Sequence, residues 1–461
     1  MQTLTTRPRS APQAVPVLRG RAFFGSLREF GRDPLAVLDS GWKQLGDLFA
    51  VRLGPRTLYA VSSPELAQAV LIEGQRTYQR SQTFEGGTPL TYVLGLSVLT
   101  TDGDTWLMKR RLMQPIFHRQ RIQAMGAQMA AAGERLLESW DRQPAGATIN
   151  LGREMKVVTL DIINRTMFSS DVLPAVDKIG ATVDVGLSYI AGRLRSPLRV
   201  PASWPTPGNR RFKQSQAALD AYLYGIIRGR RASGAHPGDL LDMLLEARDQ
   251  DTGLGMDDLE VRNEVASIYG AGHETTAVAL TWTWYALNQH PEVLCRLQQE
   301  VDTVLAGRPA APEDLPNLPY TLMVLEESMR LFPPVPLTAR SAQSAAKLGG
   351  FALPKGAVVL LVINNLHRHP DFWDQPEAFR PERFAPGKRA GINRMAYMPF
   401  LSGPHQCIGS NFALMEGQLL LAQMAQRYEL RLLPGQTVER VVAVTMRPKG
   451  GLLMRLVRRQ G

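Results

Sequence analysis

The sequence predicts a mainly α-helical fold with small peripheral sheets. From Trp106 onward, apolar residues recur at the spacing of a helix face. Before that point, two short alternating runs at 48–53 and 57–62 flank Gly54-Pro55, as the strands of a β-hairpin do. The strongest helix candidates are residues 120–140, 152–168, 211–231, 257–289, 291–306, 317–331 and 409–427. Strand-like runs return at 357–363, 440–446 and 452–457.

Length and composition favour one large domain. The chain has 461 residues, of which 44% are hydrophobic, and this suits one large core or two lobes. We find no internal repeat, no low-complexity linker and no composition break that would separate independent domains. Residues 1–20 contain arginine, proline and threonine without an apolar core segment, so we expect a disordered terminus there. Residues 21–461 are expected to form a single domain.

Cysteine content, charge and hydropathy exclude several classes of protein. The two cysteines, Cys295 and Cys407, exclude a disulfide framework and a cysteine-rich zinc site, and they suit a reducing compartment. The net charge is +11, but the basic residues are scattered and form no recognised nucleic-acid motif. An acidic protein partner is the better interpretation of this charge. No signal peptide fits, and the longest apolar run, 357–363, is too short for a transmembrane anchor, so we expect a cytoplasmic protein.

The loop from Phe400 to Gly409 carries the strongest chemical signal. Cys407 directly precedes a predicted helix, whose N-terminus supplies backbone donors and a positive field that favour a thiolate. Gly403 and Gly409 allow the backbone to pass close to a flat ligand. This setting is typical of a cysteine bound axially to haem iron. The alternative is a small buried apolar side chain, which is the usual role of a free cysteine.

The predicted helix 257–289 contains a second unusual segment, Ala271-Gly272-His273-Glu274-Thr275. Glycine inside a helix costs about 1 kcal/mol relative to alanine, and close approach of a flat ligand would explain it. The Thr275 hydroxyl can bond back to the carbonyl of Ala271 and open a local bulge. Glu274 and Thr275 could then relay protons to bound dioxygen. A packing glycine beside a back-bonded threonine is the alternative. Zinc-protease and dinucleotide motifs begin here but are incomplete.

A third segment predicts a cluster of charged side chains. Glu327 and Arg330 lie three residues apart on one helix face, just before Pro333-Pro334 ends that helix. Arg383, in the segment 379–384, could join this pair to form a buried triad. Most such pairs are instead solvated surface pairs that contribute little to stability.

The order and spacing of these segments resemble the cytochrome P450 family of haem-thiolate monooxygenases. The resemblance extends from about residue 20 to the end and is tightest from Trp106 to Gly409. It implies a large helical lobe, with haem between two long helices, and a smaller β-rich lobe. The overall pattern is closest to soluble bacterial members that resemble the microsomal and fatty-acid-hydroxylating enzymes.

The resemblance also implies roles for individual residues. Cys407 would be the proximal ligand of haem b, and Glu274 with Thr275 would deliver protons. Residues expected to line the haem or oxygen site are Trp106, Arg110, Ala271, Gly272, Arg340, Phe400, Gly403, His405 and Gly409, with His367 as a weaker candidate for a propionate. Glu327, Arg330 and Arg383 resemble the family's structural triad.

His405 departs from the arginine that the family most often has two residues before the cysteine. Histidine titrates near neutral pH, so we expect the retention of haem to depend on pH.

By the same resemblance, the protein inserts one oxygen atom of O2 into an organic substrate. The sequence contains no flavin or iron–sulfur segment, so electrons would come indirectly from NAD(P)H through an acidic ferredoxin or flavodoxin and its reductase. A basic stretch that could dock this partner comprises Lys109, Arg110, Arg111, Arg119 and Arg121. A solvated charged face is the alternative interpretation of that stretch.

The expected substrate pocket is apolar. By family analogy it includes Phe84, Leu94, Leu96, Val335 and Leu337, and this favours a lipophilic substrate such as a fatty acid, terpenoid, carotenoid or steroid. Two other functions are a peroxide-driven peroxygenase and a non-catalytic haem-binding sensor or carrier. The Glu274–Thr275 pair argues against both, because such peroxygenases typically lack the pair and mere binding does not need it.

Overall fold

The structure of the protein is a computed structural model. It describes residues 14–80, 90–169, 200–248 and 253–459, together with residues 180, 182, 185, 186, 188–190, 192 and 193. Phe84, one of the expected pocket residues, lies outside the described residues. No helix of the described chain combines the length and the apolar character that crossing a membrane requires.

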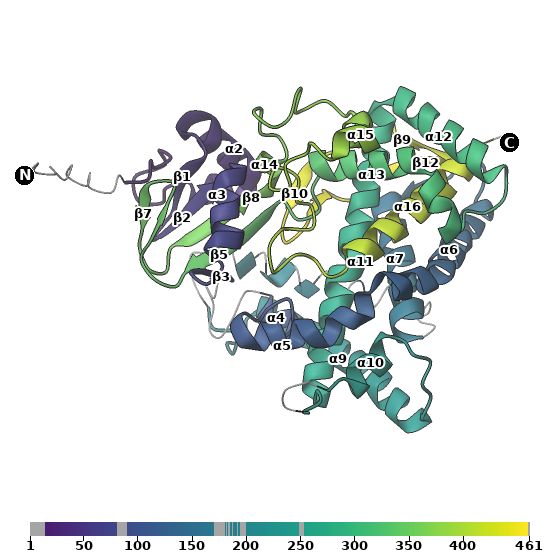
Figure 1. Ribbon diagram of the computed structural model, residues 1–461, viewed down its shortest axis with the longest axis horizontal. Helices are drawn as coiled ribbons and strands as arrows, with labels where there is room; N and C mark the ends of the chain where they lie inside the picture. The colour runs from purple at the N-terminus through teal and green to yellow at the C-terminus, as the bar shows by residue number, and fades with distance from the viewer. Residues whose placement is uncertain are drawn as a thin grey trace, which may run out of the picture.

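A large helical lobe surrounds the long helix α11 (Asp258–Gln289), which runs through the middle of the molecule (Figure 1). Helix α11 begins with a capping box, in which Asp257 and Glu260 satisfy each other's backbone N–H groups. The other helices of this lobe are α4 (Thr91–Leu94), α5 (Gly103–Met113), α6 (Arg119–Asp141), α7 (Leu151–Phe168), α9 (Pro207–Ser233), α10 (Leu240–Glu246), α12 (Pro291–Leu305), α13 (Pro319–Leu331), α15 (Pro386–Arg389) and α16 (Ser410–Arg427), with the short turns η2 (Gln114–Phe117), η4 (Pro312–Asn317) and η5 (Pro381–Phe384).

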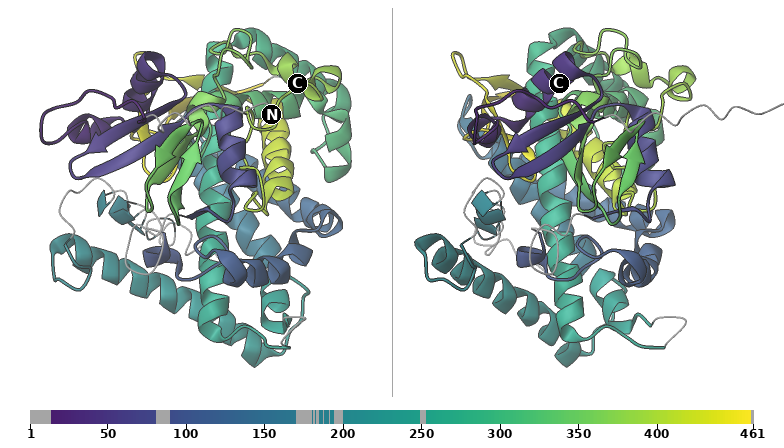
Figure 2. Two further views of the ribbon diagram at one scale, coloured as in Figure 1. Left: turned by 60° about the vertical axis from the view of Figure 1, so that its left-hand side comes forward. Right: turned by 90° about the vertical axis from the view of Figure 1, so that its left-hand side faces the viewer.

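A smaller lobe holds most of the sheet structure and lies beside the helical lobe (Figures 1 and 2). Its five-stranded sheet has the order β1-β2-β8-β5-β3, formed by β1 (Leu48–Leu53), β2 (Arg56–Val61), β3 (Tyr78–Arg80), β5 (Leu337–Ala342) and β8 (Val358–Val362). Strands β2 and β8 are parallel, and the other neighbours in the sheet are antiparallel. Around this sheet lie α1 (Leu27–Arg32), α2 (Pro34–Leu45), α3 (Pro64–Gln68), η1 (Ala69–Glu73) and α14 (Ile363–Leu366).

Three smaller sheets complete the fold. Strands β4 (Thr148–Asn150), β12 (Leu453–Arg458) and β9 (Tyr428–Leu432) form one sheet, and β6 (Ala346–Leu348) pairs with β7 (Phe351–Leu353). The third is a hairpin of β10 (Arg440–Val442) and β11 (Met446–Pro448). Its position in the fold matters below, because the hairpin contacts α11.

Most predicted elements are confirmed, and two expectations are wrong. The helix candidates correspond to α6, α7, α9, α11, α12, α13 and α16, and the predicted hairpin is β1–β2. The run 440–446 is not one strand, because the chain reverses between Val442 and Met446 and pairs with itself. Residues 14–20 are not disordered: Val15 and Leu18 are buried, and the Leu18 amide donates to Ala50 of β1. Apolar burial against the sheet therefore fixes this segment.

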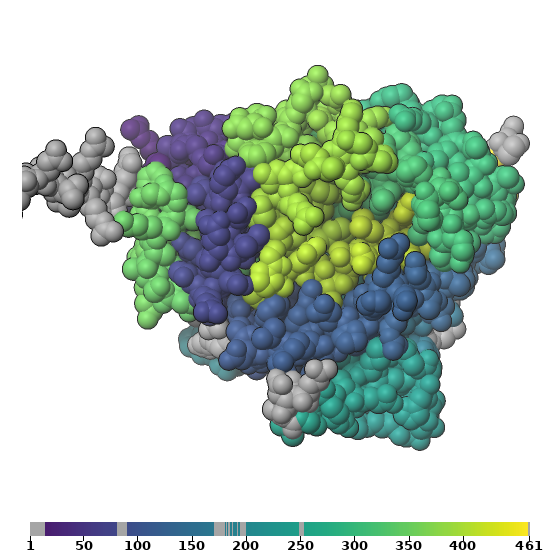
Figure 3. Space-filling model, viewed as in Figure 1, coloured from purple at the N-terminus to yellow at the C-terminus, as the bar shows by residue number. Residues whose placement is uncertain are grey.

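The C-terminal helices face the N-terminal helices across one surface of the protein. On the face seen in Figure 3, the yellow-green residues of the C-terminal part lie directly above the blue residues of α5 and α6. Helix α16 packs against α6, α11, α12 and α13, so the loop that precedes it is held at the junction of several helices.

Candidate active site

The loop before α16 is shaped by one glycine in particular. Gly403 has a φ of +79°, and a Cβ atom there would lie 2.6 Å from the carbonyl oxygen of Leu71. A side chain at this position is therefore excluded by both the backbone conformation and the packing. The Cys407 amide donates to the carbonyl of Phe400 at 2.9 Å, and this bond closes the loop. Cys407 is thereby placed two residues before Gly409, the N-cap of α16.

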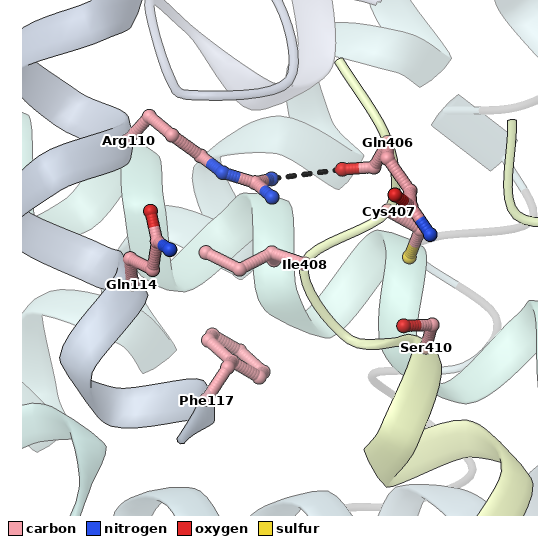
Figure 4. A pocket seen from close by; sticks show the side chains of 7 residues that line it. All are labelled: Arg110, Gln114, Phe117, Gln406, Cys407, Ile408 and Ser410. Atoms are coloured by element: carbon pink, nitrogen blue, oxygen red, sulfur yellow. Dashed lines mark hydrogen bonds between the residues drawn. The ribbon is translucent and has the colours of Figure 1, made fainter. Parts of the chain in front are cut away.

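The thiol of Cys407 lies in a mixed electrostatic environment (Figure 4). Its surroundings raise the thiol pKa through burial, while a hydrogen bond from the Gly409 backbone N–H and the charge of Arg110 act in the opposite direction. Arg110 is positioned by its own hydrogen bond to the carbonyl of Gln406, at 2.9 Å (Figure 4). The residue nevertheless remains accessible, beside a hollow of about 210 Å³ lined by Arg110, Gln114, Phe117, Gln406, Cys407, Ile408 and Ser410. A bound metal cation would stabilise the thiolate that burial alone disfavours.

Two arginines, one half-buried and one buried, lie opposite each other in the sheet. Arg80 of β3 pairs in register with Arg340 of β5, and Arg340 is only 4% exposed. Burial lowers the pKa of both guanidinium groups, and repulsion from Arg340 contributes to the pKa of about 9 for Arg80. Both side chains donate to nearby carbonyl oxygens, which hold them in place without neutralising their charge.

Among the described residues, Asp102 is the carboxylate that lies near these arginines. Both of its oxygens already have partners. It accepts hydrogen bonds from the backbone N–H groups of Arg80 and Gly103, and His405 Nε2 lies 3.3 Å from Oδ1. Burial raises the pKa of Asp102, but the contact with His405 and the two backbone bonds outweigh it and lower the pKa. The pKa of His405 is lowered, mainly by burial. The ring of Trp106 lies 4.2 Å from that of His405.

These side chains form what we call the cationic cluster: Arg80, Arg340, His405 and the neighbouring Arg110. Positive groups outnumber the one carboxylate, Asp102, in a region where charges are poorly solvated. An additional anion placed here would be stabilised strongly. Arg80 was missed by sequence analysis, since only the pairing of β3 with β5 brings it to Arg340.

Helix α11 exposes a short face in the middle of a buried element. Residues 261–269 and 276–284 are mostly buried, whereas Ala271 is exposed. The Thr275 hydroxyl donates to the carbonyl of Ala271 at 2.7 Å, as predicted. The packing of α7 gives a second reason for Gly272, because a Cβ atom there would lie 2.3 Å from Ile163 Cδ1. The expected contact of this glycine with a flat ligand stays a prediction.

The carboxylate of Glu274 points to the β10–β11 hairpin. It is 1% exposed, its Oε1 accepts a hydrogen bond from Thr445 at 3.0 Å, and Arg447 Nη1 lies 3.5 Å away. Its Oε2 has no hydrogen-bond partner among the described residues. Arg447 also lines a cavity of about 500 Å³ between α7, α11 and the hairpin. The partners of Glu274 and of Thr275 are therefore different, and Arg447 links Glu274 to that cavity.

A second buried carboxyl group lies on α16. Glu416 is fully buried, and neither of its oxygens makes a well-aligned hydrogen bond among the described residues. Burial raises its pKa to about 8, while Thr276 of α11 acts in the opposite direction. Glu416 is therefore mostly protonated at neutral pH. No spacing in the sequence singled it out.

The predicted charge triad forms in the core. Arg330 donates to Glu327 at 2.7 and 2.8 Å, and Arg383 Nε lies 3.2 Å from the same carboxylate. His367 belongs here and not to the cationic cluster, contrary to the weaker expectation. Its Nδ1 lies 3.2 Å from the Arg330 carbonyl, and its Nε2 accepts the Met398 amide. Burial lowers the pKa of His367 to about 3, so it is neutral at physiological pH.

Other expected site residues have different surroundings. Lys109 is 2% exposed and pairs with Glu264 at 3.2 Å, so it is not part of a docking face.

Among the expected pocket residues, Leu94 is buried against Gly270 of α11, as a pocket residue would be. Leu96 is 51% exposed, and Leu337 packs with the apolar cluster of Leu35, Val442 and Met446. Val335 is half-buried. The exposure of Leu96 and the contacts of Leu337 therefore give no support for placing either residue in the substrate pocket.

Comparison with known proteins agrees with this geometry. The chain matches the Cytochrome P450 family model over residues 15–454. It is 36% identical over 430 residues to a cyclooctat-9-en-7-ol 5-monooxygenase of Streptomyces melanosporofaciens, covering 93% of this chain and 91% of that one. It is 30% identical over 453 residues to a pentalenene oxygenase of Streptomyces avermitilis, covering 98% and 97%. The crystal structure of the cytochrome P450DA heme domain superposes with a TM-score of 0.88 at 27% identity, covering 97% and 98%.

The fold and the site therefore define an oxygen-inserting oxidoreductase that uses haem. The chain belongs to the cytochrome P450 family and has the P450 fold. The described residues also fit the cofactor on chemical grounds. The accessible thiol of Cys407 suits the iron, and the cationic cluster suits the two propionates. Ala271 and Thr275 offer a small face on α11 beside which a flat group can lie.

Proposed function

We propose that this P450 oxidises a lipophilic terpenoid, using electrons that an acidic ferredoxin or flavodoxin passes on from NAD(P)H. The observation that carries the substrate class is the match to two relatives named for terpenoid oxidation, over more than nine-tenths of this chain. The apolar surroundings of Leu94 beside α11 are compatible with such a substrate. Fatty acids and steroids, which the sequence left open, have no such support.

In this proposal each group of side chains has a separate task. Haem b, when bound, supplies the activation of O2 and the insertion of one oxygen atom into the substrate. Cys407 would hold the iron as a thiolate, and the propionates would be held by Arg80, Arg340, His405, Trp106 and Arg110. Ala271 leaves room next to α11 for oxygen and substrate.

The protein would also control the protons. The Thr275 hydroxyl, bonded to the carbonyl of Ala271, is positioned to donate a hydrogen bond into the oxygen site once it is released from that carbonyl. Glu274 would resupply it after turning from Thr445 and Arg447. Because Arg447 lines the 500 Å³ cavity, solvent protons can reach Glu274 from that side.

The test begins with the spectrum of the dithionite-reduced protein with carbon monoxide. We expect the red-shifted band of thiolate-ligated haem, and its loss in Cys407→Ala. Cyclic terpene hydrocarbons and alcohols should then shift the spectrum of the oxidised enzyme and be converted, in preference to a fatty acid and a steroid of similar size. Preferred binding and conversion of the fatty acid or the steroid would contradict the terpenoid proposal but leave the P450 assignment intact.

The redox partner requires a separate test. Arg111, Arg119 and Arg121 are exposed on α5 and α6. The blue surface of these helices lies below the yellow-green C-terminal residues in Figure 3. Arg119→Glu/Arg121→Glu should slow reduction by an acidic ferredoxin about tenfold at low salt, since rim charges mainly control association. Arg210→Glu/Arg211→Glu, an exposed pair on α9, is the matched control. Equal rates for the two double variants would reject this docking face.

A further inference from the structure

Two adjacent phenylalanines protrude from the small lobe. Phe23 is 86% exposed and Phe24 is 65% exposed, which is unusual for side chains of this size. Among the described residues, neither ring packs into an apolar cluster. They occupy the end of a tight turn, residues 21–25, which we call the aromatic tip. Exposed aromatic rings of this kind indicate a surface that meets another apolar phase.

The aromatic tip is held in place by the backbone. Arg21 and Gly25 exchange two hydrogen bonds, of 3.0 and 2.8 Å, across the turn. The carbonyl of Phe24 accepts the Gly54 amide of the β1–β2 turn at 3.0 Å, and the Ser26 amide donates to Arg52 of β1 at 2.8 Å. Gly25 has a φ of +57° and fits directly against Arg52. The two rings are thus presented by a braced structure and not by a frayed terminus.

Positive charge surrounds the aromatic tip. Arg19, Arg21, Arg28 and Arg52 are exposed on the segments that carry it or brace it. Glu29 opposes them through an exposed ion pair with Arg21, at 3.4 Å, which neutralises little at such a surface. The rings are therefore flanked by arginines, in a protein whose net charge is +11.

We propose that the aromatic tip docks the protein on an anionic lipid surface, with the Phe23 and Phe24 rings in the interfacial layer and the arginines at the lipid headgroups. Aromatic rings are favoured at the membrane–water interface, and each nearby arginine attracts the anionic headgroups. The tip is a turn of five residues, and its small size suits insertion between lipids better than a protein interface, where a larger complementary area is needed. This docking is peripheral and needs no membrane-spanning helix.

The position of the aromatic tip leaves the rest of the enzyme free. It lies at the β1–β2 end of the small lobe, which is on the opposite side of the molecule from α12 in Figure 1. A lipid surface touching this end would not cover the helical lobe around α12 and α16. The inference concerns binding to lipid and is independent of which substrate the enzyme oxidises.

The test is flotation of the full-length holoenzyme with vesicles. We expect binding to vesicles that contain phosphatidylglycerol, little binding to pure phosphatidylcholine, and release at high salt.

Phe23→Ser/Phe24→Ser should weaken binding by roughly tenfold or more, because the buried apolar area drives insertion. The matched control is Leu254→Ser/Leu259→Ser, which removes two other exposed apolar side chains, 71% and 57% exposed, and should bind like the wild type. Arg28→Gln should weaken binding about fivefold.

A direct readout separates insertion from mere adsorption. Phe23→Trp should be quenched by bromine-labelled lipids in phosphatidylglycerol vesicles, and the carbon monoxide spectrum of each variant reports that it has folded with haem. Wild-type-like binding of the Phe23→Ser/Phe24→Ser variant would overturn the proposal, as would absence of quenching. The proposal would also be overturned if the wild type bound no lipid and Phe23→Ser/Phe24→Ser lost self-association or binding to another protein. The aromatic tip would then be a protein interface.

Discussion

Two clusters of arginine in the described part of the protein differ in how their charge is balanced. In the triad, Arg330 and Arg383 share the carboxylate of Glu327, and Arg330 also donates to the carbonyls of His367, Pro376 and Ala378. In the cationic cluster, Arg80 and Arg340 repel each other, and Asp102 is already bonded to backbone N–H groups. Among the described residues the triad has its own counter-ion, whereas the cationic cluster has an excess of positive charge that an added anion would balance. We therefore propose that the first cluster stabilises the fold and that the second binds the cofactor.

The largest effect should come from breaking the triad. Glu327→Gln leaves the buried guanidinium of Arg330 without its counter-ion, and we expect a loss of about 3–5 kcal/mol in the free energy of unfolding. Urea unfolding followed by circular dichroism measures it. The control is Glu382→Gln, which removes an exposed partner of Arg296 and should cost less than about 1 kcal/mol. Similar costs for the two variants would mean that the triad is not a stabilising element.

The opposite behaviour is expected in the cationic cluster. Arg340→Leu removes one of two repelling buried charges, so the stability of the apoprotein should stay within about 1 kcal/mol of wild type or increase. Haem affinity should nevertheless fall by about tenfold or more, because a charged hydrogen-bond donor to a propionate is lost. Haem transfer to apomyoglobin measures the affinity, with Lys347→Leu, at the exposed position of strand β6, as the control. If Arg340→Leu greatly lowered the stability of the apoprotein and left the haem affinity unchanged, the cationic cluster would be a stabilising element and not a cofactor site.

Two histidines, one beside each cluster, test the comparison through pH. Burial lowers the pKa of His367, beside the triad, to about 3, so it stays neutral, and burial also lowers the pKa of His405 from 6.5. A bound propionate would raise the pKa of His405 again, so its contribution to haem affinity is present at low pH and is lost as pH rises through the pKa of the holoprotein. Haem release measured from pH 5 to 8 should therefore accelerate with pH.

The matched variants for this prediction are His405→Arg and His236→Arg. The first keeps a positive charge at all pH values and should flatten the profile, and the second changes an exposed histidine and should leave it unchanged. A flat profile in the wild type would show that His405 does not hold a propionate.

The last prediction concerns Glu416, a buried acid with no counter-charge among the described residues. Its pKa of about 8 in the folded protein exceeds the ordinary value of 4.5, so the folded state binds a proton that the unfolded state has released. The stability that this proton contributes is complete below pH 4.5 and is lost as pH rises towards 8, at up to about 1.4 kcal/mol per pH unit. Glu416→Gln should remove this part of the pH dependence in urea unfolding. An identical pH dependence in both proteins would contradict a raised pKa.

Local contacts were predictable because their partners are close in sequence. The bond from Thr275 to Ala271 spans one helical turn, and Glu327 meets Arg330 on the same face of α13. The seven helix candidates could be placed because long amphipathic or buried helices carry a strong periodic signal. The short hairpin β10–β11 was missed, since three-residue strands carry almost no such signal.

Motif order and helical periodicity can be read from the sequence alone, and they were sufficient to assign the family, the fold and Cys407 as the candidate iron ligand. The electrostatic balance of the site depends instead on tertiary contacts. The pairing of β3 with β5 brings Arg80 to Arg340, the C-terminal hairpin brings Thr445 and Arg447 to Glu274, and the packing of α16 buries Glu416. Burial and long-range pairing set the free energy of these charges, and neither is encoded in the spacing of residues along the chain.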